Sequence, residues 1–306
     1  MPTKVLVVGP IARDVTLLVD ELPEDGASVL ARDAVVAAGG KGGNPASAIA
    51  ALGVPVALLG AVGDDAHGDA VLAELDERGV DVSAVKRLPG AATAHIVHLV
   101  QPHGHRRYVE HPAANTSVEL TAPDIQAHTS ANPYTLVSTA LPLAAARTAA
   151  SCSRAVGATV IVDASGSPET VRAVLPDTTI LRCDADEAAA FTGRTPEDFE
   201  SAEAIATELL AAGPRIVVVA SAVGDLVARR NGPSLRLPHL PVELVDPTGG
   251  GDAFAGTLAA ALAEGRPLEH AARLASAAAA DTVARLGGRP RFDRASLLRR
   301  LDAAVR

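Results

Sequence analysis

The segment from Asp246 to Gly256, which reads DPTGGGDAFAG, carries the strongest chemical signal in the sequence. Its three consecutive glycines, Gly249, Gly250 and Gly251, let the backbone approach a ligand and turn successive N–H groups toward it. A long helix is expected to start here, and a helix N-terminus adds positive potential. We therefore predict an anion site that suits a phosphate, with Asp252 beside the anion as a base for an incoming hydroxyl. The alternative is an ordinary aspartate N-cap after a glycine turn.

A second glycine-rich segment, GGKGGNP from Gly39 to Pro45, also leads into an alanine-rich helix. Pro45 suits the first position of that helix, which would leave Lys41 and Asn44 exposed in the turn. Lys41 offers three hydrogen-bond donors, and Asn44 offers both donors and an acceptor, a set that suits a polyhydroxyl ligand. A plain glycine-rich turn is the alternative.

Two common nucleotide-binding motifs are absent from the sequence. Lys41 is followed by Gly42 rather than by serine or threonine, so the G-x-x-x-x-G-K-[ST] motif of a P-loop does not occur. After the first expected strand, Gly9 leads into Pro10 and Ile11, which does not fit the G-x-G-x-x-G motif of a dinucleotide site. Neither a P-loop nor a Rossmann site is therefore expected.

Composition and charge limit the class of protein. The 306 residues are 48% hydrophobic and 21% charged, which indicates a globular chain, and the net charge of −9 argues against a broad nucleic-acid surface. Cys152 and Cys183 lack the spacing of a metal site or a disulfide framework. The N-terminus lacks the pattern of a secretory signal, and apolar runs such as Ile216–Ala220 are too short to span a membrane. We expect a soluble, cytoplasmic protein with neither a membrane nor a nucleic-acid partner.

Short β-branched runs alternate with alanine-rich stretches along the chain. The runs predict buried parallel strands, at Val5–Val8, Val56–Leu59, Leu136–Ser138, Val160–Asp163, Thr179–Leu181 and Ile216–Val219. The stretches predict helices, at Pro45–Leu52, Gly68–Arg78, Leu143–Val156, Glu187–Thr192, Ser201–Ala212, Asp252–Ala263 and Leu268–Ala284. A further strand is expected to end at Val242–Val245. Alternation of this kind is typical of a parallel sheet with helices on both faces.

Two stretches interrupt this alternation, at about residues 11–37 and 91–111. Each of them predicts strands with no helix between them. Four strands split between two insertions could form one small antiparallel sheet beside the main domain. The alternative is a set of edge strands on the main sheet.

Together, the two glycine segments resemble the signatures of the ribokinase family, also called the PfkB carbohydrate kinases. Residues 39–53 resemble the N-terminal signature, G-G-K-G-x-N before an alanine-rich helix that ends in Leu-Gly. Residues 246–256 resemble the C-terminal signature, D-x-T-G-x-G-D-x-F-x-G. The resemblance implies a single kinase domain over residues 1–306, folded as a ribokinase-like three-layer α/β/α sandwich with a mainly parallel sheet. Residues of about 11–37 and 91–111 would then form a small β-sheet lid over the sugar.

The resemblance also implies roles for individual positions. Asp252 corresponds to the base that takes the proton of the acceptor hydroxyl, and the amides of Gly249, Gly250 and Gly251 correspond to the anion hole. The other implied contacts are with the sugar, at Asp14, Gly40, Lys41, Asn44 and Asp252; with ATP, at Ser221, Gly224, Thr248, Gly249, Gly251 and Ser276; and with a monovalent cation, expected to be K⁺, at Asp246, Thr248 and Gly288.

The sequence departs from the family pattern in three places. The N-x-x-E motif, which organises Mg²⁺ through water, appears as DADE from Asp184 to Glu187, and both end residues still offer oxygen donors suited to Mg²⁺. In the stretch that usually reads T-L-G-x-x-G, Val219 replaces the threonine and Ser221 replaces the first glycine. Ala140 stands where ribokinases proper carry a glutamate that contacts ribose, so we expect free ribose to be a poor acceptor.

These features favour an ATP-dependent carbohydrate kinase that uses Mg²⁺ and K⁺. A nucleoside kinase of the same family is the alternative, although Tyr108 is the only phenylalanine, tyrosine or tryptophan in the expected lid. A non-catalytic sugar sensor would need neither Asp252 nor the glycine triplet. An exposed lid edge or face further predicts a homodimer that pairs lid to lid. The identity of the acceptor, and of the hydroxyl that is phosphorylated, does not follow from the sequence.

Overall fold

The fold is built around a buried parallel strand near the N-terminus. The computed structural model describes residues 4–129 and 134–304, so residues 1–3 and 305–306 of the predicted 1–306 domain lie outside the described residues. In β1 (Val5–Val8), Val5 and Val7 join one apolar core, while Leu6 and Val8 join a second. Successive side chains of a strand point to opposite faces, so this continuous apolar run requires a sheet that is covered on both sides.

The main sheet has nine strands among the described residues. Their order is β15 (Leu235–Pro238), β14 (Gly224–Arg229), β13 (Ile216–Ser221), β12 (Ile180–Cys183), β11 (Thr159–Asp163), β10 (Tyr134–Ser138), β1, β4 (Val56–Leu59) and β6 (Val80–Asp81). Neighbours from β13 to β6 pair in parallel, while β14 and β15 extend one edge as antiparallel strands. The mainly parallel sheet that the sequence predicts is confirmed.

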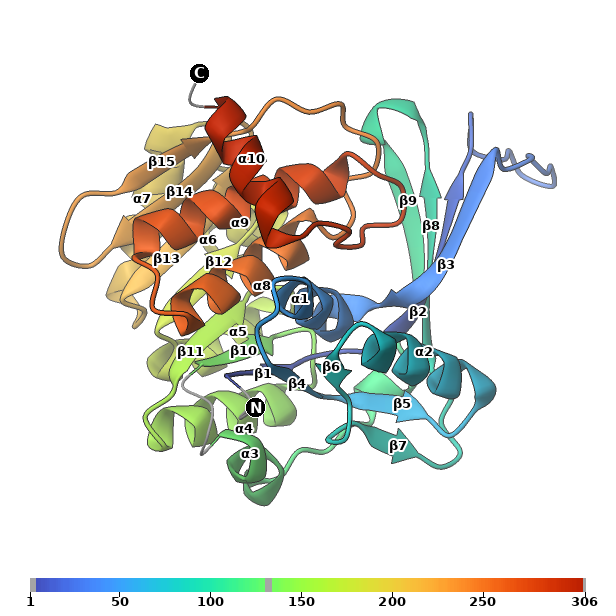
Figure 1. Cartoon of the computed structure of the whole chain (residues 1–306), viewed down its shortest axis with the longest axis horizontal. Helices are drawn as coiled ribbons and strands as arrows, with labels where there is room; N and C mark the ends of the chain where they lie inside the picture. The colour runs from blue at the N-terminus through green and yellow to red at the C-terminus, as the bar shows by residue number, and fades with distance from the viewer. Residues whose placement is uncertain (1–3, 130–133, 305–306) are drawn as a thin grey trace.

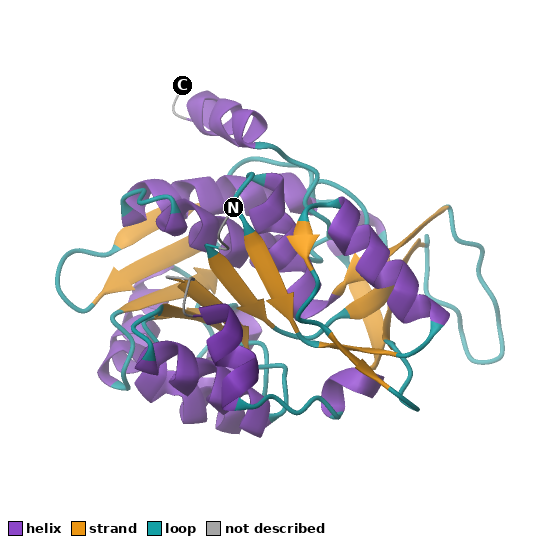
Figure 2. Ribbon diagram, turned by 60° about the horizontal axis from the view of Figure 1, so that its bottom comes forward, coloured by secondary structure: helices purple, strands orange, loops and turns teal. Residues whose placement is uncertain are grey.

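Helices cover the two faces of this sheet, which gives the predicted three layers (Figures 1 and 2). One core is shared with α1 (Gly40–Ala51), α2 (Ala66–Glu77), α8 (Gly250–Ala263), α9 (Leu268–Val283) and α10 (Arg294–Ala304). The other core is shared with α3 (Ala122–Thr129), α4 (Leu143–Ala155), α5 (Pro168–Val174), α6 (Ala185–Thr192) and α7 (Phe199–Ala211). Both glycine segments therefore feed helices on the same face of the sheet, α1 and α8.

The two stretches that interrupt the alternation form a separate small sheet, which projects from the main body at the right of Figure 1. Its order is β3 (Asp33–Gly39), β2 (Ala12–Leu18), β8 (Ala94–Val100) and β9 (Arg106–His111). The two outer pairs, β3 with β2 and β8 with β9, are antiparallel. The two central strands, β2 and β8, pair in parallel. The sheet is therefore mixed, and the expectation of an antiparallel one was wrong. The other described strands outside the main sheet, β5 (Ala61–Gly63) and β7 (Lys86–Leu88), form a two-stranded pair.

Two local expectations from the sequence were also wrong. Residues 242–245 form no strand, because this run lies between Pro241 and Pro247, which lack N–H groups, and the backbone amide of Val245 donates instead to Val283 O at 2.9 Å. Helix α1 begins at Gly40 rather than at Pro45. Gly42 packs so tightly on Gly9 that a Cβ on Gly42 would lie 2.7 Å from the Gly9 backbone, and this contact holds the glycines in the helix.

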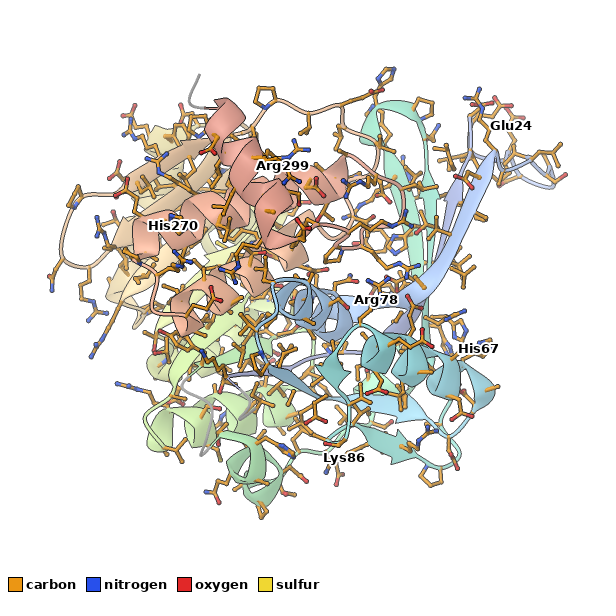
Figure 3. The ribbon with its side chains drawn as sticks, in the orientation of Figure 1. Glu24, His67, Arg78, Lys86, His270 and Arg299 are labelled. Carbon is orange, nitrogen blue, oxygen red and sulfur yellow. The ribbon has the colours of Figure 1, made fainter. Side chains whose placement is uncertain are left out.

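Charged side chains such as those of Glu24 and Arg299 are exposed at the surface (Figure 3). Within residues 4–129 and 134–304, no helix combines the length and apolar character needed to cross a membrane.

Candidate active site

Helix α8 begins inside the glycine triplet and offers N–H groups to a cavity. Gly249 has a φ of 74°, a left-handed conformation that favours glycine, and a Cβ there would collide with the carbonyl oxygen of Gly288. No side chain in the described part of the chain caps this helix. The N–H groups of Gly250 and Gly251 are therefore available to an anion at the positive end of the helix.

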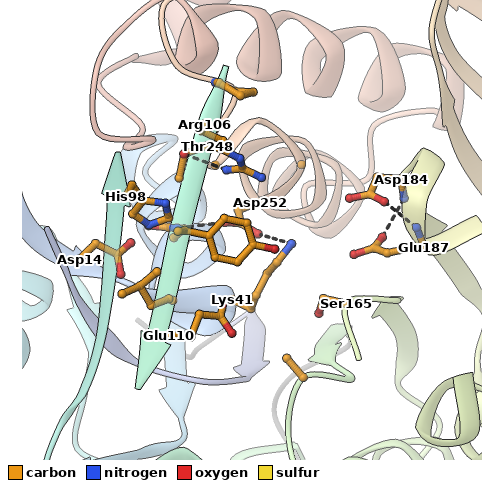
Figure 4. A pocket seen from close by; sticks show the side chains of 18 of the residues that line it. Asp14, Lys41, His98, Arg106, Glu110, Ser165, Asp184, Glu187, Thr248 and Asp252 are labelled. Atoms are coloured by element: carbon orange, nitrogen blue, oxygen red, sulfur yellow. Dashed lines mark hydrogen bonds and ion pairs between the residues drawn. The ribbon is translucent and has the colours of Figure 1, made fainter. Parts of the chain in front are cut away.

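Asp252 lies in the first turn of α8 and lines a cavity of about 380 Å³. Its Oδ2 accepts a hydrogen bond from Asn44 Nδ2 at 2.9 Å, and its Oδ1 lies 3.5 Å from Lys41 Nζ (Figure 4). Oδ1 is buried and has no hydrogen-bond partner among the described residues. One carboxylate oxygen is thus fixed by an amide, while the other can accept a proton.

Lys41 lies between two carboxylates, with Nζ 3.6 Å from Asp163 Oδ2 and 3.5 Å from Asp252 Oδ1. Burial opposes the charge of the ammonium group, but Asp252 and Asp163 outweigh burial and hold the pKa of Lys41 above its usual range. Burial likewise opposes the charge of Asp163, yet Lys41 and Arg182 keep the pKa of this carboxyl below its usual value. The cavity therefore contains a permanently charged network.

Asp14 is a buried and poorly compensated carboxylate of the site. Its side chain fills the space that a Cβ on Gly39 would need, and its Oδ1 is buried without a hydrogen-bond partner in the described structure. Burial, followed by repulsion from Asp252, raises the pKa of Asp14 to about 7, and Glu110 adds to the repulsion. A ligand hydroxyl could supply the missing hydrogen bond.

The small sheet adds three polar residues that the sequence analysis did not identify as part of the site. In the pairing of β8 with β9, Ile96 lies opposite Glu110, His98 opposite Tyr108 and Val100 opposite Arg106. His98, Glu110 and Arg106 line the cavity. Both ring nitrogens of His98 are buried and unpartnered among the described residues, and burial lowers the pKa of this imidazole, which keeps it neutral. Period-two alternation along β8 and β9 was the only sequence signal for these residues.

Arg106 connects the small sheet to the glycine loop. Its Nη1 donates to Thr248 Oγ1 at 2.8 Å, and the guanidinium lies over the Tyr108 ring at 5.3 Å from the centroid. Arg106 lines both the first cavity and a neighbouring cavity of about 680 Å³.

This second cavity is mostly apolar, and it contains some of the residues predicted to contact ATP. Ser221, Ser276 and Gly251 line it together with Phe254 and Val283. Thr248 and Gly249 line the first cavity instead. Gly224 lines neither cavity. A Cβ there would collide with Leu237 O, so packing explains why this position is glycine. Of the six predicted positions, the structure thus brings Ser221, Ser276 and Gly251 to the second cavity, places Thr248 and Gly249 in the first, and leaves Gly224 outside both.

The predicted Mg²⁺ residues are joined by a capping box at the start of α6. Asp184 Oδ1 accepts from Glu187 N at 2.8 Å, and Glu187 Oε2 accepts from Asp184 N at 2.7 Å. Both side chains line the first cavity, and in each carboxylate one oxygen is not used by the capping box. No cluster of three or more histidine, cysteine or acidic side chains in the described structure could hold a metal ion by itself.

The predicted monovalent-cation residues lie where two loops meet. Asp246 is fully buried, and its two oxygens accept from Thr248 N and Gly287 N, both at 2.9 Å. Gly288 packs on Thr248 so closely that a Cβ would lie 2.8 Å from Thr248 O. Asp246 thereby ties the loop before α8 to the loop after α9.

Arg182 is a further charged residue of the site that the sequence analysis missed, in addition to Arg106 and Glu110. It occupies β12, an otherwise apolar strand that reads ILRC, and its Nη1 lies 3.1 Å from Asp163 Oδ1 and 3.9 Å from Glu187 Oε2. A single arginine inside a buried strand was a signal in itself, because buried charges require partners.

The substitution Asp14→Asn should stabilise the protein while weakening ligand binding. Because the folded chain binds the Asp14 proton more tightly than the unfolded chain, whose pKa is about 3.9, stability falls as pH rises from about 4 to about 7. Asparagine removes this loss, so we expect a gain in unfolding free energy of about 1–3 kcal/mol at pH 8 and little gain at pH 4.

Denaturant unfolding at both pH values measures this difference, and Asp76→Asn, on an exposed position of α2, is the matched control. An equal gain at both pH values, or a larger gain in acid, would contradict the assignment of a raised pKa to Asp14.

Comparison with known proteins gives consistent matches over nearly the whole chain. The family model described as pfkB family carbohydrate kinase matches residues 2–293. A ribokinase of Schizosaccharomyces pombe is 29% identical over 258 residues, which cover 81% of this chain and 81% of that protein. The structure of Arabidopsis thaliana ribokinase complexed with ribose and ATP is similar with a TM-score of 0.87 at 28% identity, covering 98% of this chain and 99% of that one. Ribokinase from Thermotoga maritima gives a TM-score of 0.83 at 25% identity, with 98% and 99% covered.

Proposed function

The chain belongs to the pfkB family of carbohydrate kinases, and from this premise we propose that it transfers the γ-phosphate of ATP to a hydroxyl group of a sugar or sugar derivative, with Asp252 as the general base. One observation carries this proposal. A buried carboxylate oxygen without a hydrogen-bond partner among the described residues, Asp252 Oδ1, lies in the first turn of a helix whose N-terminal N–H groups are not capped by a side chain. A base beside an anion site is what transfer to a hydroxyl requires.

In the proposed reaction, the acceptor hydroxyl gives its proton to Asp252. The hydroxyl oxygen forms a bond to the γ-phosphorus while the bond from that phosphorus to the β,γ-bridging oxygen breaks, and ADP leaves with the bond electrons. The amides of Gly249, Gly250 and Gly251 receive the charge that develops on the transferred group. Asn44 holds Oδ2 of Asp252, which leaves Oδ1 for the proton.

Two ions fit the residues of the site. Mg²⁺ would be held through water by Asp184 and Glu187, whose remaining carboxylate oxygens suit a hard cation, and it would neutralise charge on the ATP phosphates. K⁺ would be held beside Asp246, where the backbones of Thr248 and Gly288 come together. The position of Asp246 between two loops supports this assignment, since an ion there would stabilise the backbone next to the glycine triplet.

The two cavities suggest how the substrates divide between them. The first cavity, with Asp14, Gly40, Lys41 and Asn44, offers hydrogen-bonding groups to a polyol, and the small sheet would cover this acceptor as a lid. The second cavity offers Phe254 and other apolar side chains to the adenine of ATP, with Ser221 and Ser276 as polar contacts. Gly251 lines both cavities and therefore marks the place where the phosphate would pass from donor to acceptor.

A nucleoside acceptor is the second candidate, and one observation favours it. The rings of His98 and Tyr108 lie side by side on the small sheet, with centroids 5.9 Å apart at an interplanar angle of 38°. Such a surface could contact a flat base as well as a sugar. A sensor without activity is disfavoured, because binding alone would not need the arrangement around Asp252.

Replacing the proposed base should abolish most turnover without unfolding the protein. For Asp252→Asn we expect kcat to fall by roughly 10²–10⁴, the usual contribution of a general base, while ATP still binds and the melting temperature changes little. Steady-state kinetics, nucleotide titration and thermal melting measure the three quantities, with Asp76→Asn again as the control. Wild-type turnover in a folded Asp252→Asn protein would exclude the role.

Free ribose should be a poor acceptor. Ala140 lines the acceptor cavity and cannot accept a hydrogen bond from a sugar hydroxyl, whereas a charged partner contributes on the order of 1.5–3 kcal/mol. We expect kcat/KM for ribose to lie roughly tenfold to a hundredfold below that of the best acceptor among fructose, a ketodeoxy sugar acid and adenosine. Ribose as clearly the best of the four would show that the inference from Ala140 is wrong.

We also propose a homodimer that forms through the outer face of the small sheet. Strand pairing places Val36, Val15, Val97 and Val109 in one row across all four strands, and Val109 is 73% exposed. A row of this kind can meet its own copy about a two-fold axis, which removes apolar surface from water on both chains.

A charge in the middle of this row should prevent the proposed association. We expect Val97→Glu to convert a dimer into a monomer at micromolar concentration, as measured by light scattering, because a buried carboxylate without a partner is costly. Val156→Glu, at another exposed valine just after α4, is the control and should leave the dimer intact. A wild-type chain that is already monomeric under these conditions would refute the proposed dimer.

A further inference from the structure

Arg182 is a buried cation with most of its hydrogen-bonding capacity unused. Its side chain is only 7% exposed, and it makes a single hydrogen bond among the described residues, from Nη1 to Asp163 Oδ1 at 3.1 Å. Its Nε is buried without a partner in the described structure. A guanidinium has five N–H donors in a planar fork, so this arrangement leaves donors directed at no protein acceptor.

The guanidinium lies directly against the glycine triplet. A Cβ built on Gly251 would lie 2.5 Å from Arg182 Nη2, 2.6 Å from Nη1 and 2.7 Å from Cζ. A side chain at position 251 would therefore displace the guanidinium of Arg182, although Gly251 itself does not have a positive φ. The unused donors of Arg182 thus lie next to the N–H groups at the start of α8.

Arg182 also lies where the two cavities meet. It lines the acceptor cavity together with Asp252 and Lys41, and it lines the second cavity together with Ser221 and Ser276. Arg182 is thus one of the residues at the boundary between the two cavities, together with Arg106, Asp184, Asp186, Pro247 and Gly251.

Arg182 is charged under all ordinary conditions. Burial opposes the charge of the guanidinium, but Asp163 and then Glu187 outweigh burial and hold the pKa of Arg182 above its usual range. Asp163 is shared, because Oδ1 faces Arg182 while Oδ2 faces Lys41. One carboxylate therefore positions the two cations that line the acceptor cavity near Asp252.

From this placement we propose that Arg182 is a further catalytic residue, which donates hydrogen bonds to non-bridging oxygens of the phosphoryl group during its transfer. The inference rests on the proposed kinase function and adds a charged donor to the amides of the glycine triplet. Arg182 keeps its protons throughout, since Asp252 takes the hydroxyl proton and ADP carries the electrons of the broken bond. A fixed fork beside Gly251 matches the oxygens of a phosphate better than a single ammonium does.

The competing explanation is that Arg182 only neutralises Asp163 and Glu187. The two explanations differ in which nucleotide loses affinity when the arginine is replaced. A contact with the transferred group depends on the γ-phosphate, whereas a structural role affects every nucleotide alike.

The test uses Arg182→Gln and Arg182→Lys in the full-length chain, with Arg154→Gln, an exposed arginine on α4, as the control that removes the same charge. Calorimetric titration with AMP, ADP and the non-hydrolysable β,γ-imido analogue of ATP requires no acceptor. For Arg182→Gln we expect the analogue to bind at least tenfold more weakly and AMP less than threefold more weakly. Turnover should fall by about 10²–10³, as expected for the loss of one donor to the transferred group.

Arg182→Lys keeps the charge that Asp163 and Glu187 require, so it carries the test if the glutamine variant does not fold. We expect it to bind the analogue nearly as well as the wild type but to recover little of kcat, because the fork is lost. Equal loss of affinity for all three nucleotides, or recovery of turnover when Asp163→Asn is added to Arg182→Gln, would overturn the proposal. Failure of the kinase function itself would appear separately, as a wild-type chain that phosphorylates no acceptor with ATP.

Discussion

The candidate site depends on how closely α1 can approach α8. A Cβ on Gly256 would lie 2.5 Å from Pro45 O and 2.9 Å from Ala48 Cβ, so glycine at this position lets the two helices pack almost backbone to backbone. Asn44 therefore reaches Asp252 at 2.9 Å, although the two residues are 208 positions apart in the sequence. A larger residue at 256 would separate the groups that hold the carboxylate from the carboxylate itself.

Some charged groups around Asp252 have partners of opposite charge, and others do not. The difference matches what a ligand-binding site requires. Lys41 and Arg182 share Asp163, so that one buried carboxylate compensates both the partly exposed ammonium group and the buried guanidinium. Asp14 has no such partner, so it remains a carboxylate that a ligand must satisfy. A site that were fully satisfied without a ligand would gain stability but would have no group left with which to bind a polar substrate.

The sequence predicted what depends on local periodicity and on glycine, and it missed what depends on packing. Buried runs such as Val5–Val8 identify strands because parallel strands are apolar on both faces, and the glycine triplet identifies the start of α8. His98 gave no comparable signal, and the arginine within the apolar strand β12 indicated only that Arg182 needs a partner, because the place of both residues in the site comes from strand register and from which helix start lies above the strand end. Residues 242–245 were misassigned for a related reason: a short apolar run does not reveal whether a neighbouring strand is available.

The contact between Arg106 and Thr248 relates the small sheet to the rest of the site. Arg106 comes from β9, yet its hydrogen bond ends on the loop that leads into the glycine triplet, and its side chain forms a wall of both cavities. If the two cavities hold the acceptor and ATP as proposed, the small sheet that covers the acceptor would thus also close part of the ATP cavity. Water in the site would compete with the acceptor hydroxyl for the phosphate, so a wall that borders both cavities would help to exclude water during the proposed transfer. The antiparallel pairing of β8 with β9 makes this possible, since β9 returns toward the main domain beside the outgoing β8 and so carries Glu110 on the same cavity wall as Arg106.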